Sequence, residues 1–499
     1  MFRSFASALV SFIAILLFAF AILFLWNGSE GINFARVAFE GDRSTVTILE
    51  QYRREQMKIA DAARLEAERA SKGMTTDTPE PVAATGGDGP AVVVWISIPG
   101  FRGDYLEKAE TPFLDKLATD GGATNKMRPN FPCLTFPAHA TLATGVTPDK
   151  HGIIADQIRT APGEVVTKPG DATLLLAEPI WVTSTRQGVK TLVHDWPLSQ
   201  KQSGEHKAAY FLDTYDPETT DEVRLTKALE QWRASAKGGD AAAAPAAAPA
   251  APGGDKLRLL MLRLDDIGKQ GLLHGPRADE TFAAVTATDK ALQTFFDTAQ
   301  AEWATLAPEN ANLVILITTD HGIAELDKNV NIAQLLGGAM MANADIVAHD
   351  AIANLFFKGL PENEGEKKIF IDKFDNELSK RIYFRTLKKE ELPAEWAYLN
   401  PERTGDRVLV LKTGYAFSDH KGTEPVFDPS EGPGLFGGFG YPVEESIRMS
   451  GQIFLAGYPN SPLSGPLEEV GQTGFHATVC KILGIDPAEG ANKETLPLK

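Results

Sequence analysis

The sequence contains little cysteine and shows no concentration of positive charge. Only Cys133 and Cys480 occur among 499 residues, which excludes a disulfide-rich scaffold. Acidic residues number 66 and basic residues 49, so the formal net charge is −17. A protein that binds nucleic acid through its phosphates needs a basic surface. We therefore expect no nucleic-acid partner. No internal repeat is visible in the sequence.

The N-terminus contains one long apolar run. Phe5 to Trp26 comprises 22 residues without a charge, which as a helix spans roughly 33 Å, enough to cross a bilayer core of about 30 Å. A cleaved signal peptide is the alternative, but its apolar region is usually shorter and ends in a small-residue cleavage site. The run predicts a retained single-pass anchor within residues 1–27. We expect the large domain on the non-cytosolic side, although the flanking arginines barely discriminate between the two orientations. The sequence does not identify which membrane holds the anchor.

The next segments predict a stalk and a linker. Residues 28–72 include a stretch rich in helix formers with a thin apolar stripe, which indicates a stalk helix that is either solvated or contacts other membrane-protein subunits. Residues 73–90 are rich in Pro, Gly and Thr and predict a linker. The folded domain is expected over residues 91–499. An Ala/Pro-rich stretch over residues 238–254 predicts an exposed insertion loop within it.

Short apolar runs alternate with helical patterns in this domain. Near-continuous apolar runs are typical of strands buried on both faces of a mainly parallel sheet. The alternation predicts an α/β fold, with a mainly parallel central sheet sandwiched by helices and ligands at the carboxyl ends of the strands. The expected strands are Ala91–Ile98, Leu257–Leu264, Leu313–Thr318, Arg407–Lys412 and Gln452–Ala456, and the expected helices include Thr111–Asp120 and Thr281–Leu306.

An ordered series of motifs lies in and after these strands. They are Ile98-Pro99-Gly100-Phe101-Arg102, Met127-Arg128-Pro129, Phe131 to His139 (FPCLTFPAH), Thr144-Gly145, His151-Gly152-Ile153, Glu178 to Val182 (EPIWV), Trp196-Pro197, Thr319-Asp320-His321-Gly322 and Gly438-Phe439-Gly440-Tyr441. In this order they resemble the nucleotide pyrophosphatase/phosphodiesterase family of the alkaline phosphatase superfamily. The resemblance spans roughly residues 92–487 and implies the alkaline-phosphatase-like fold.

The resemblance implies a phosphodiesterase chemistry based on two zinc ions. In active members a Thr attacks phosphorus while two zinc ions hold the attacking and leaving oxygens. Matched residue by residue, Thr135 is the nucleophile, and Asp320, His321 and Asp265 stand at zinc-ligand positions.

Three of the six expected protein ligands are replaced. Pro99 stands where the family has an Asp, and Lys269 and Phe439 stand where it has His. The Asn expected three residues after the nucleophile is Ala138. A lone carboxylate beside a Lys ammonium holds zinc poorly, and an unactivated Thr is a weak nucleophile. The sequence therefore predicts no zinc or one weakly bound zinc, whereas an active enzyme would hold two.

Two replacements for the lost groups stay open. His274 lies beside a Gly-Pro pair that the family places near its lost His, so a shifted loop could return an imidazole to the site. Alternatively, Lys269 could neutralise a bound phosphate directly. A structural role for Lys269 is a salt bridge to Asp265 or Asp266 that stabilises the former metal pocket.

Aromatic residues at the family's base-binding positions are retained. Phe136 and Tyr215 match the two positions that stack on a nucleobase, and Trp196 lies nearby. Stacking on a base contributes roughly 1–3 kcal/mol per ring, so the pocket could bind a nucleotide-like ligand. Packing in the core is the alternative role of these rings.

Three functional hypotheses follow. The first is a membrane-anchored member that has lost zinc-dependent hydrolysis and acts as a binding or structural subunit of a membrane assembly. The second is an active but divergent phosphodiester or pyrophosphate hydrolase that uses Thr135 with residual metal binding. The third is a metal-free nucleotide sensor. The degraded ligand set favours the first.

Overall fold

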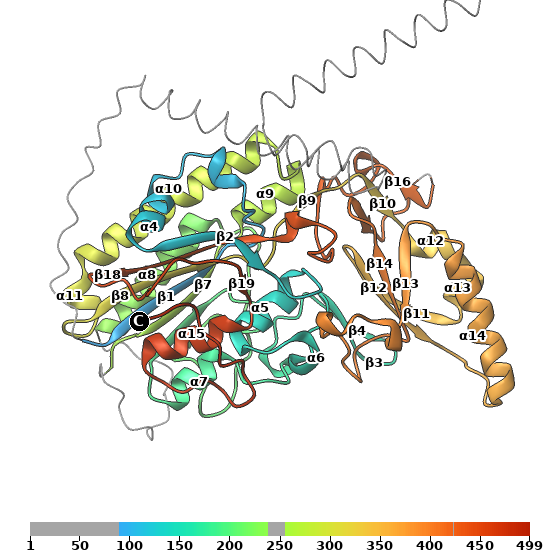
Figure 1. Ribbon diagram of the computed structural model, residues 1–499, viewed down its shortest axis with the longest axis horizontal. Coiled ribbons are helices and arrows are strands. Elements are labelled where there is room, and N and C mark those ends of the chain that lie inside the picture. The colour runs from blue at the N-terminus through green and yellow to red at the C-terminus, as the bar shows by residue number, and fades with distance from the viewer. Residues whose placement is uncertain (1–88, 238–254, 423) are drawn as a thin grey trace, which may run out of the picture. The chain divides into compact units, whose positions relative to one another are not determined.

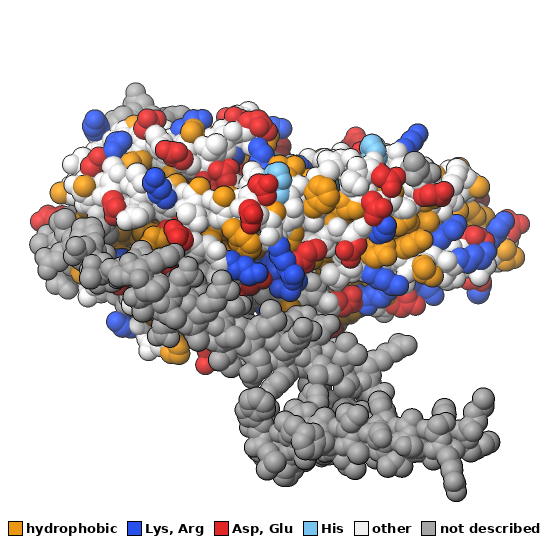
Figure 2. Space-filling view, turned by 90° about the horizontal axis from the view of Figure 1, so that it is seen from above, with side chains coloured by type: hydrophobic (Ala, Val, Ile, Leu, Met, Phe, Trp, Pro, Cys, Tyr) orange, Lys and Arg blue, Asp and Glu red, His pale blue; other side chains and the backbone are white. Residues whose placement is uncertain are grey.

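The computed structural model describes residues 89–237, 255–422 and 424–499. The predicted anchor (5–26), stalk (28–72), nearly all of the linker (73–90) and the insertion loop (238–254) lie outside these residues. Within the described residues no helix is both long enough and apolar enough to cross a membrane. On the face of the molecule shown in Figure 2, acidic and basic side chains are interspersed over the described residues.

A mainly parallel sheet of eight strands forms the centre of the domain (Figure 1). β1 lies between β7 and β8 and is parallel to both, and β5 continues the parallel order beyond β7. β18 pairs antiparallel with β8 and with β2. In spatial order the strands are β19 (Val470–Gly471), β2 (Gly122–Arg128), β18 (Gly451–Tyr458), β8 (Asn312–Thr318), β1 (Ala91–Ser97), β7 (Leu259–Arg263), β5 (Thr191–His194) and β6 (Tyr210–Phe211).

Helices cover both faces of this sheet because its strands are apolar on both sides. Val92, Val94 and Ile96 of β1 pack with one helical layer, whereas Val93 and Trp95 pack with the other. The first layer comprises α4 (Pro112–Asp120), α8 (Asp221–Ala236), α10 (Asp279–Ala301) and α11 (Trp303–Leu306), and the second comprises α5 (Thr135–Thr144), α7 (Ile180–Arg186) and α15 (Gly474–Leu483). The predicted α/β sandwich is confirmed.

A second sheet corrects one part of the strand prediction. The apolar run at Arg407–Leu411 forms a strand, β14, but it belongs to a separate four-stranded antiparallel sheet of order β11-β12-β14-β13. Its other strands are β11 (Ala344–His349), β12 (Ile352–Phe357) and β13 (Phe384–Lys388), with α14 (Glu364–Ser379) beside them. A buried run of five residues does not encode which sheet it joins, so its hydrophobicity alone could not reveal the second sheet.

Shorter elements connect the two sheets. α9 (Asp266–His274) follows β7, and a hairpin of β3 (Gln157–Ala161) and β4 (Glu164–Thr167) contacts the second sheet. Besides short 3-10 helices, the remaining described elements are α6 (Pro148–His151), β9 (Ala324–Glu325), β10 (Lys328–Val330), α12 (Ile332–Leu336), α13 (Gly338–Met341), β15 (Tyr415–Phe417), β16 (Val426–Phe427) and β17 (Gly437–Gly438).

Candidate functional site

The carboxyl ends of β1, β7 and β8 meet at one edge of the central sheet. Ser97 pairs with Arg263 on one side and with Thr318 on the other, so the segments that follow these strands are neighbours. A cavity of about 1300 Å³ lies at this edge, and residues of the second sheet complete its wall. Ligands bind at this edge in open parallel sheets, which makes the cavity the candidate functional site.

The structure divides the sequence-predicted residues into two groups. Thr135, Phe136, Trp196, Tyr215 and Phe439 line the cavity. The others do not line it: Asp265, Asp320 and His321 are buried, whereas Lys269 and His274 lie elsewhere on α9.

Thr135 and His321 are in contact at the start of α5. Thr135 is the first residue of that helix, and its Oγ1 lies 3.3 Å from Nε2 of His321. Nδ1 of His321 lies 2.8 Å from the carbonyl oxygen of Gly322, so a proton on Nδ1 leaves Nε2 as an acceptor for the Thr135 hydroxyl. The Phe439 ring lies 4.4 Å from the imidazole ring, centroid to centroid. Because Phe439 lines the cavity, it covers the imidazole that the family would use as a zinc ligand.

Asp320 is fully buried behind this pair. Its Oδ1 accepts hydrogen bonds from the backbone N–H groups of Gly100 and His321, at 3.0 and 2.6 Å. Its Oδ2 has no hydrogen-bond partner and lies 3.4 Å from Nε2 of His321 and 3.9 Å from Nδ1 of His139. Burial acts to raise the pKa of Asp320, but the two imidazoles and the two backbone donors outweigh it and hold the pKa below its ordinary value.

Asp265 is neutralised by two arginines that the sequence analysis did not single out. A guanidinium nitrogen of Arg263 lies 2.7 Å from its Oδ1, and one of Arg224 lies 3.3 Å from its Oδ2. The Tyr215 hydroxyl donates a 2.5 Å hydrogen bond to Oδ2. Arg224 also pairs with Asp195. Arg263 could have been found from the sequence, because it is a charged residue at the end of an apolar strand two residues before Asp265. Arg224 could not have been found in this way, because it lies far from Asp265 in the sequence.

Neither predicted replacement enters the site. Lys269 forms no salt bridge to Asp265 or Asp266; its Nζ lies 3.4 Å from Glu218 and 3.2 Å from the carbonyl oxygen of Pro217. The helix begins at Asp266 and carries Lys269 away from the cavity. His274 ends the same helix, half exposed, with Nδ1 3.9 Å from Glu280. The structure therefore does not return this imidazole to the family's zinc position.

Two further predicted positions have backbone or packing roles. Pro99 is buried at the end of β1, and the next residue, Gly100, adopts φ +70° and donates its N–H to Asp320. Ala138 lies on the buried side of α5 and does not line the cavity. The polar group beside the start of α5 is instead Asp156, whose Oδ1 accepts a 2.9 Å hydrogen bond from the N–H of Phe136.

These residues do not fit the family's two zinc ions. At one position the single carboxylate, Asp265, is already bound by two guanidinium groups, which stay protonated at any physiological pH. At the other, Asp320 and His321 supply one carboxylate and one imidazole where zinc needs about three protein ligands. Within the described ranges, the only group of three His, Cys, Asp or Glu side chains close enough to hold an ion is Asp156, His349 and Asp350.

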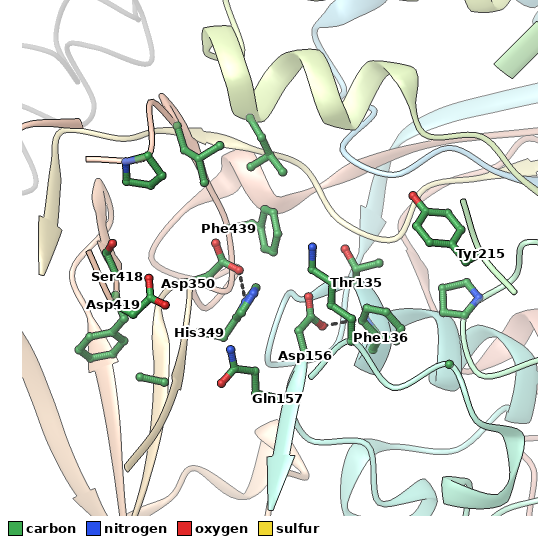
Figure 3. A pocket seen from close by; sticks show the side chains of 18 of the residues that line it. Thr135, Phe136, Asp156, Gln157, Tyr215, His349, Asp350, Ser418, Asp419 and Phe439 are labelled. Carbon is green, nitrogen blue, oxygen red and sulfur yellow. Dashed lines mark hydrogen bonds and ion pairs between the residues drawn. The ribbon is translucent and has the colours of Figure 1, made fainter. Parts of the chain in front are cut away.

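The aromatic residues differ in their surroundings. Trp196 is buried, with its ring 5.0 Å from Trp95 and 5.1 Å from His139, so it packs mainly in the core. Phe136 and Tyr215 lie on one side of the cavity, whereas His349 and Asp350 lie on the other (Figure 3). The rings of Phe136 and Tyr215 therefore remain in position to contact a ligand.

Comparisons with known proteins identify relatives. Residues 93–437 match the family model of type I phosphodiesterase / nucleotide pyrophosphatase. An uncharacterized pyrophosphatase/phosphodiesterase of Schizosaccharomyces pombe is 26% identical over 336 residues, covering 65% of this chain and 64% of the relative. Ectonucleotide pyrophosphatase/phosphodiesterase family member 7 of Rattus norvegicus is 24% identical over 418 residues, covering 79% and 83%.

Solved structures show the same fold. Murine ectonucleotide pyrophosphatase/phosphodiesterase 5 superimposes with a TM-score of 0.63 at 22% identity, covering 79% of this chain and 96% of that one. An inactive variant of the same murine protein in complex with AMP gives a TM-score of 0.62. Since the family model spans more than half of the sequence, this chain belongs to the type I phosphodiesterase / nucleotide pyrophosphatase family.

Proposed function

We propose that this chain is a non-hydrolysing member of its family, held at a membrane by residues 5–26, that serves as a binding or structural subunit of a membrane assembly. The observation that carries the proposal is the pairing of Asp265 with Arg263 and Arg224. A carboxylate that served as a zinc ligand would face the metal. This one faces two permanent positive charges.

The electrostatics of that pairing oppose zinc. The side chain of Arg224 is 1% exposed and that of Arg263 is 13% exposed, and charges at such sites interact more strongly than charges in bulk water. A divalent cation beside Asp265 would be repelled by both guanidinium groups. Without a metal at that position, the leaving oxygen of a phosphodiester loses the stabilisation on which two-metal hydrolysis depends.

The remaining cavity supports a binding role. Phe136 and Tyr215 line it, and base stacking on such rings contributes roughly 1–3 kcal/mol each. Arg263 also lines it and offers a positive charge toward an anionic ligand. A related murine protein has been captured with AMP. We therefore propose a nucleotide-like ligand for this cavity, bound without the family's zinc ions.

One contact favours the alternative of residual hydrolysis. The 3.3 Å separation between Thr135 Oγ1 and His321 Nε2 places a base beside the family's nucleophile. General-base assistance of this kind contributes typically 10²–10⁴-fold, which is far below what enzymes achieve on phosphate esters.

The test is hydrolysis of the p-nitrophenyl ester of thymidine monophosphate by the full-length protein, with and without added zinc. Thr135→Ala is the matched control, and binding of AMP by calorimetry shows that each protein is folded. We expect equal, background rates of nitrophenolate release from both proteins. We also expect Phe136→Ala to weaken AMP binding about five- to a hundredfold, in line with the loss of one stacking ring. Zinc-stimulated turnover that Thr135→Ala abolishes would overturn the proposal.

A further inference from the structure

Three chemistry-bearing side chains that line the cavity are not among the residues that the family resemblance assigns to the zinc site. Asp156 lies between α6 and β3, His349 ends β11, and Asp350 follows it in the turn to β12. One ligand atom from each lies within 4.8 Å of the others. All three line the cavity, and Figure 3 shows their polar ends gathered beside Thr135 and Phe136.

Asp156 is a buried residue whose carboxylate lines the cavity and has one oxygen that accepts no hydrogen bond from the described residues. The residue is 2% exposed. Its Oδ1 accepts the Phe136 N–H, but within the described part of the chain its Oδ2 has neither a hydrogen bond nor an ion pair. A buried carboxylate in this state is costly unless a cation compensates it. Burial accordingly raises the pKa of Asp156.

His349 and Asp350 face this carboxylate as a close ion pair. Burial acts to lower the pKa of His349, but the Asp350 carboxylate outweighs it and raises the pKa to about 9. The ligand atom of this imidazole lies within 4.8 Å of a ligand atom from each of the two carboxylates. A metal ion binds the neutral imidazole, so binding releases any proton that the imidazole carries.

The donor set is that of a transition-metal site. Two carboxylate oxygens and one imidazole nitrogen suit zinc or manganese. Three protein ligands with a fourth position open to a cavity are typical of zinc sites that accept water or a ligand. Two atoms that each lie roughly 2.0–2.2 Å from one zinc ion are at most about 4.4 Å apart, so ligand atoms separated by up to 4.8 Å would move closer together when they bind the ion.

We propose that Asp156, His349 and Asp350 bind one divalent cation of the zinc or manganese type, with an open coordination position that faces the cavity. The site is separate from the family's zinc positions, where Asp265 is neutralised by arginines. It stands whether or not the chain hydrolyses phosphodiesters. An oxygen of a ligand in the cavity, such as that of a phosphate, would complete the coordination.

The test is titration of the EDTA-treated, full-length protein with zinc alone, followed by calorimetry or by competition with a fluorescent zinc chelator. We expect one zinc per chain, and at least a tenfold weaker affinity in both Asp156→Asn and His349→Gln. Asp419→Asn, a carboxylate in the same cavity outside the cluster, should bind as the wild type does. Thermal melts confirm that each variant is folded, and Asp350→Asn replaces any variant that is not.

The outcomes separate this inference from the proposed function. Wild-type zinc affinity in folded Asp156→Asn and His349→Gln would overturn the inference. Loss of zinc in folded Asp320→Asn, with retention in Asp156→Asn, would place the ion at the family's position and overturn both proposals. If Asp156→Asn and His349→Gln lose zinc, and zinc stimulates a turnover that Thr135→Ala abolishes, the inference would be supported and only the proposed function would be overturned.

Discussion

At the scale of single residues, the carboxylate of Asp265 is balanced by arginine side chains. Asp265 lies two residues after β7, and its side chain is buried. Its partners are Arg263, Arg224 and Tyr215, which together contact both oxygens. The residue therefore serves the packing of β7 against α8, because Arg224 belongs to that helix.

Asp265→Asn tests this structural role. The substitution keeps the shape of the side chain but removes the one carboxylate that, within the described residues, forms an ion pair with the Arg263 guanidinium. Breaking a buried pair by removing one partner costs roughly 3–5 kcal/mol, so we expect the free energy of unfolding in urea to fall by about 3 kcal/mol. Asp297→Asn, an exposed carboxylate on α10, is the control. Equal stability of the two variants would contradict the structural role.

His151 makes stability depend on pH. Its Nδ1 accepts the N–H of Ile153 at 3.1 Å, and its Nε2 lies 3.0 Å from the Thr141 hydroxyl. Burial, assisted by the charge of Arg403, lowers the pKa of His151 to about 3. The unfolded chain, with a His pKa near 6.5, takes up a proton before the native state does, so stability falls as pH drops below about 6.5.

The expected slope can be measured. His151 alone should reduce the free energy of unfolding by about 1.4 kcal/mol per pH unit between pH 6.5 and pH 3. Urea unfolding at pH 7 and pH 5 should therefore show a smaller difference in His151→Gln than in the wild type. An identical pH dependence in the two proteins would contradict the neutral, buried state of this imidazole.

The sequence predicted the site only in part, because some of its contacts join residues that are far apart in the chain. Asp320 and His321 lie in a short motif after β8, Thr135 begins α5, and the structure brings the three residues together at the sheet edge. Arg224 reaches Asp265 across 41 positions of the chain, and His349 reaches Asp156 from another sheet. Pairings of this range depend on how the sheets are assembled, which no local pattern encodes.

At the scale of elements, apolar runs predicted strands well and their partners poorly. β1, β7 and β8 lie close to the predicted bounds and form the parallel centre. β14 also matches its run but pairs antiparallel in the second sheet. Burial on both faces is common to both environments, so hydrophobicity identified the strands without assigning them to a sheet.

The junction of β8 with the segment before β18 depends on Gly322. Its N–H donates to the carbonyl of Met449, and a Cβ there would lie 1.8 Å from the carbonyl oxygen of Arg448. Backbone cannot move aside as a flexible side chain can. We expect Gly322→Ala to reduce the free energy of unfolding by about 3 kcal/mol, at the upper end of the cost of overpacking. Gly338→Ala, where nothing lies within 4 Å, should change it by less than about 1 kcal/mol. Similar values for both would contradict the close contact.

At the scale of the whole molecule, the membrane anchor is a prediction of the sequence alone. The run from Phe5 to Trp26 has the length and composition of a single span. The full chain should sediment with membranes and resist extraction by alkaline carbonate, whereas a chain that lacks residues 1–27 should appear in the supernatant. Release of the full chain into the supernatant by alkaline carbonate would contradict the prediction of an anchor.

We propose that the positions of this chain that match the family's zinc ligands do not bind zinc. Anomalous diffraction at the zinc edge, from crystals of the full-length protein grown with zinc, tests it most directly. We expect no anomalous peak beside Asp265 or between Asp320, His321 and Thr135. One peak at Asp156, His349 and Asp350 is compatible with this expectation. A peak at either of the family's positions would contradict the proposal.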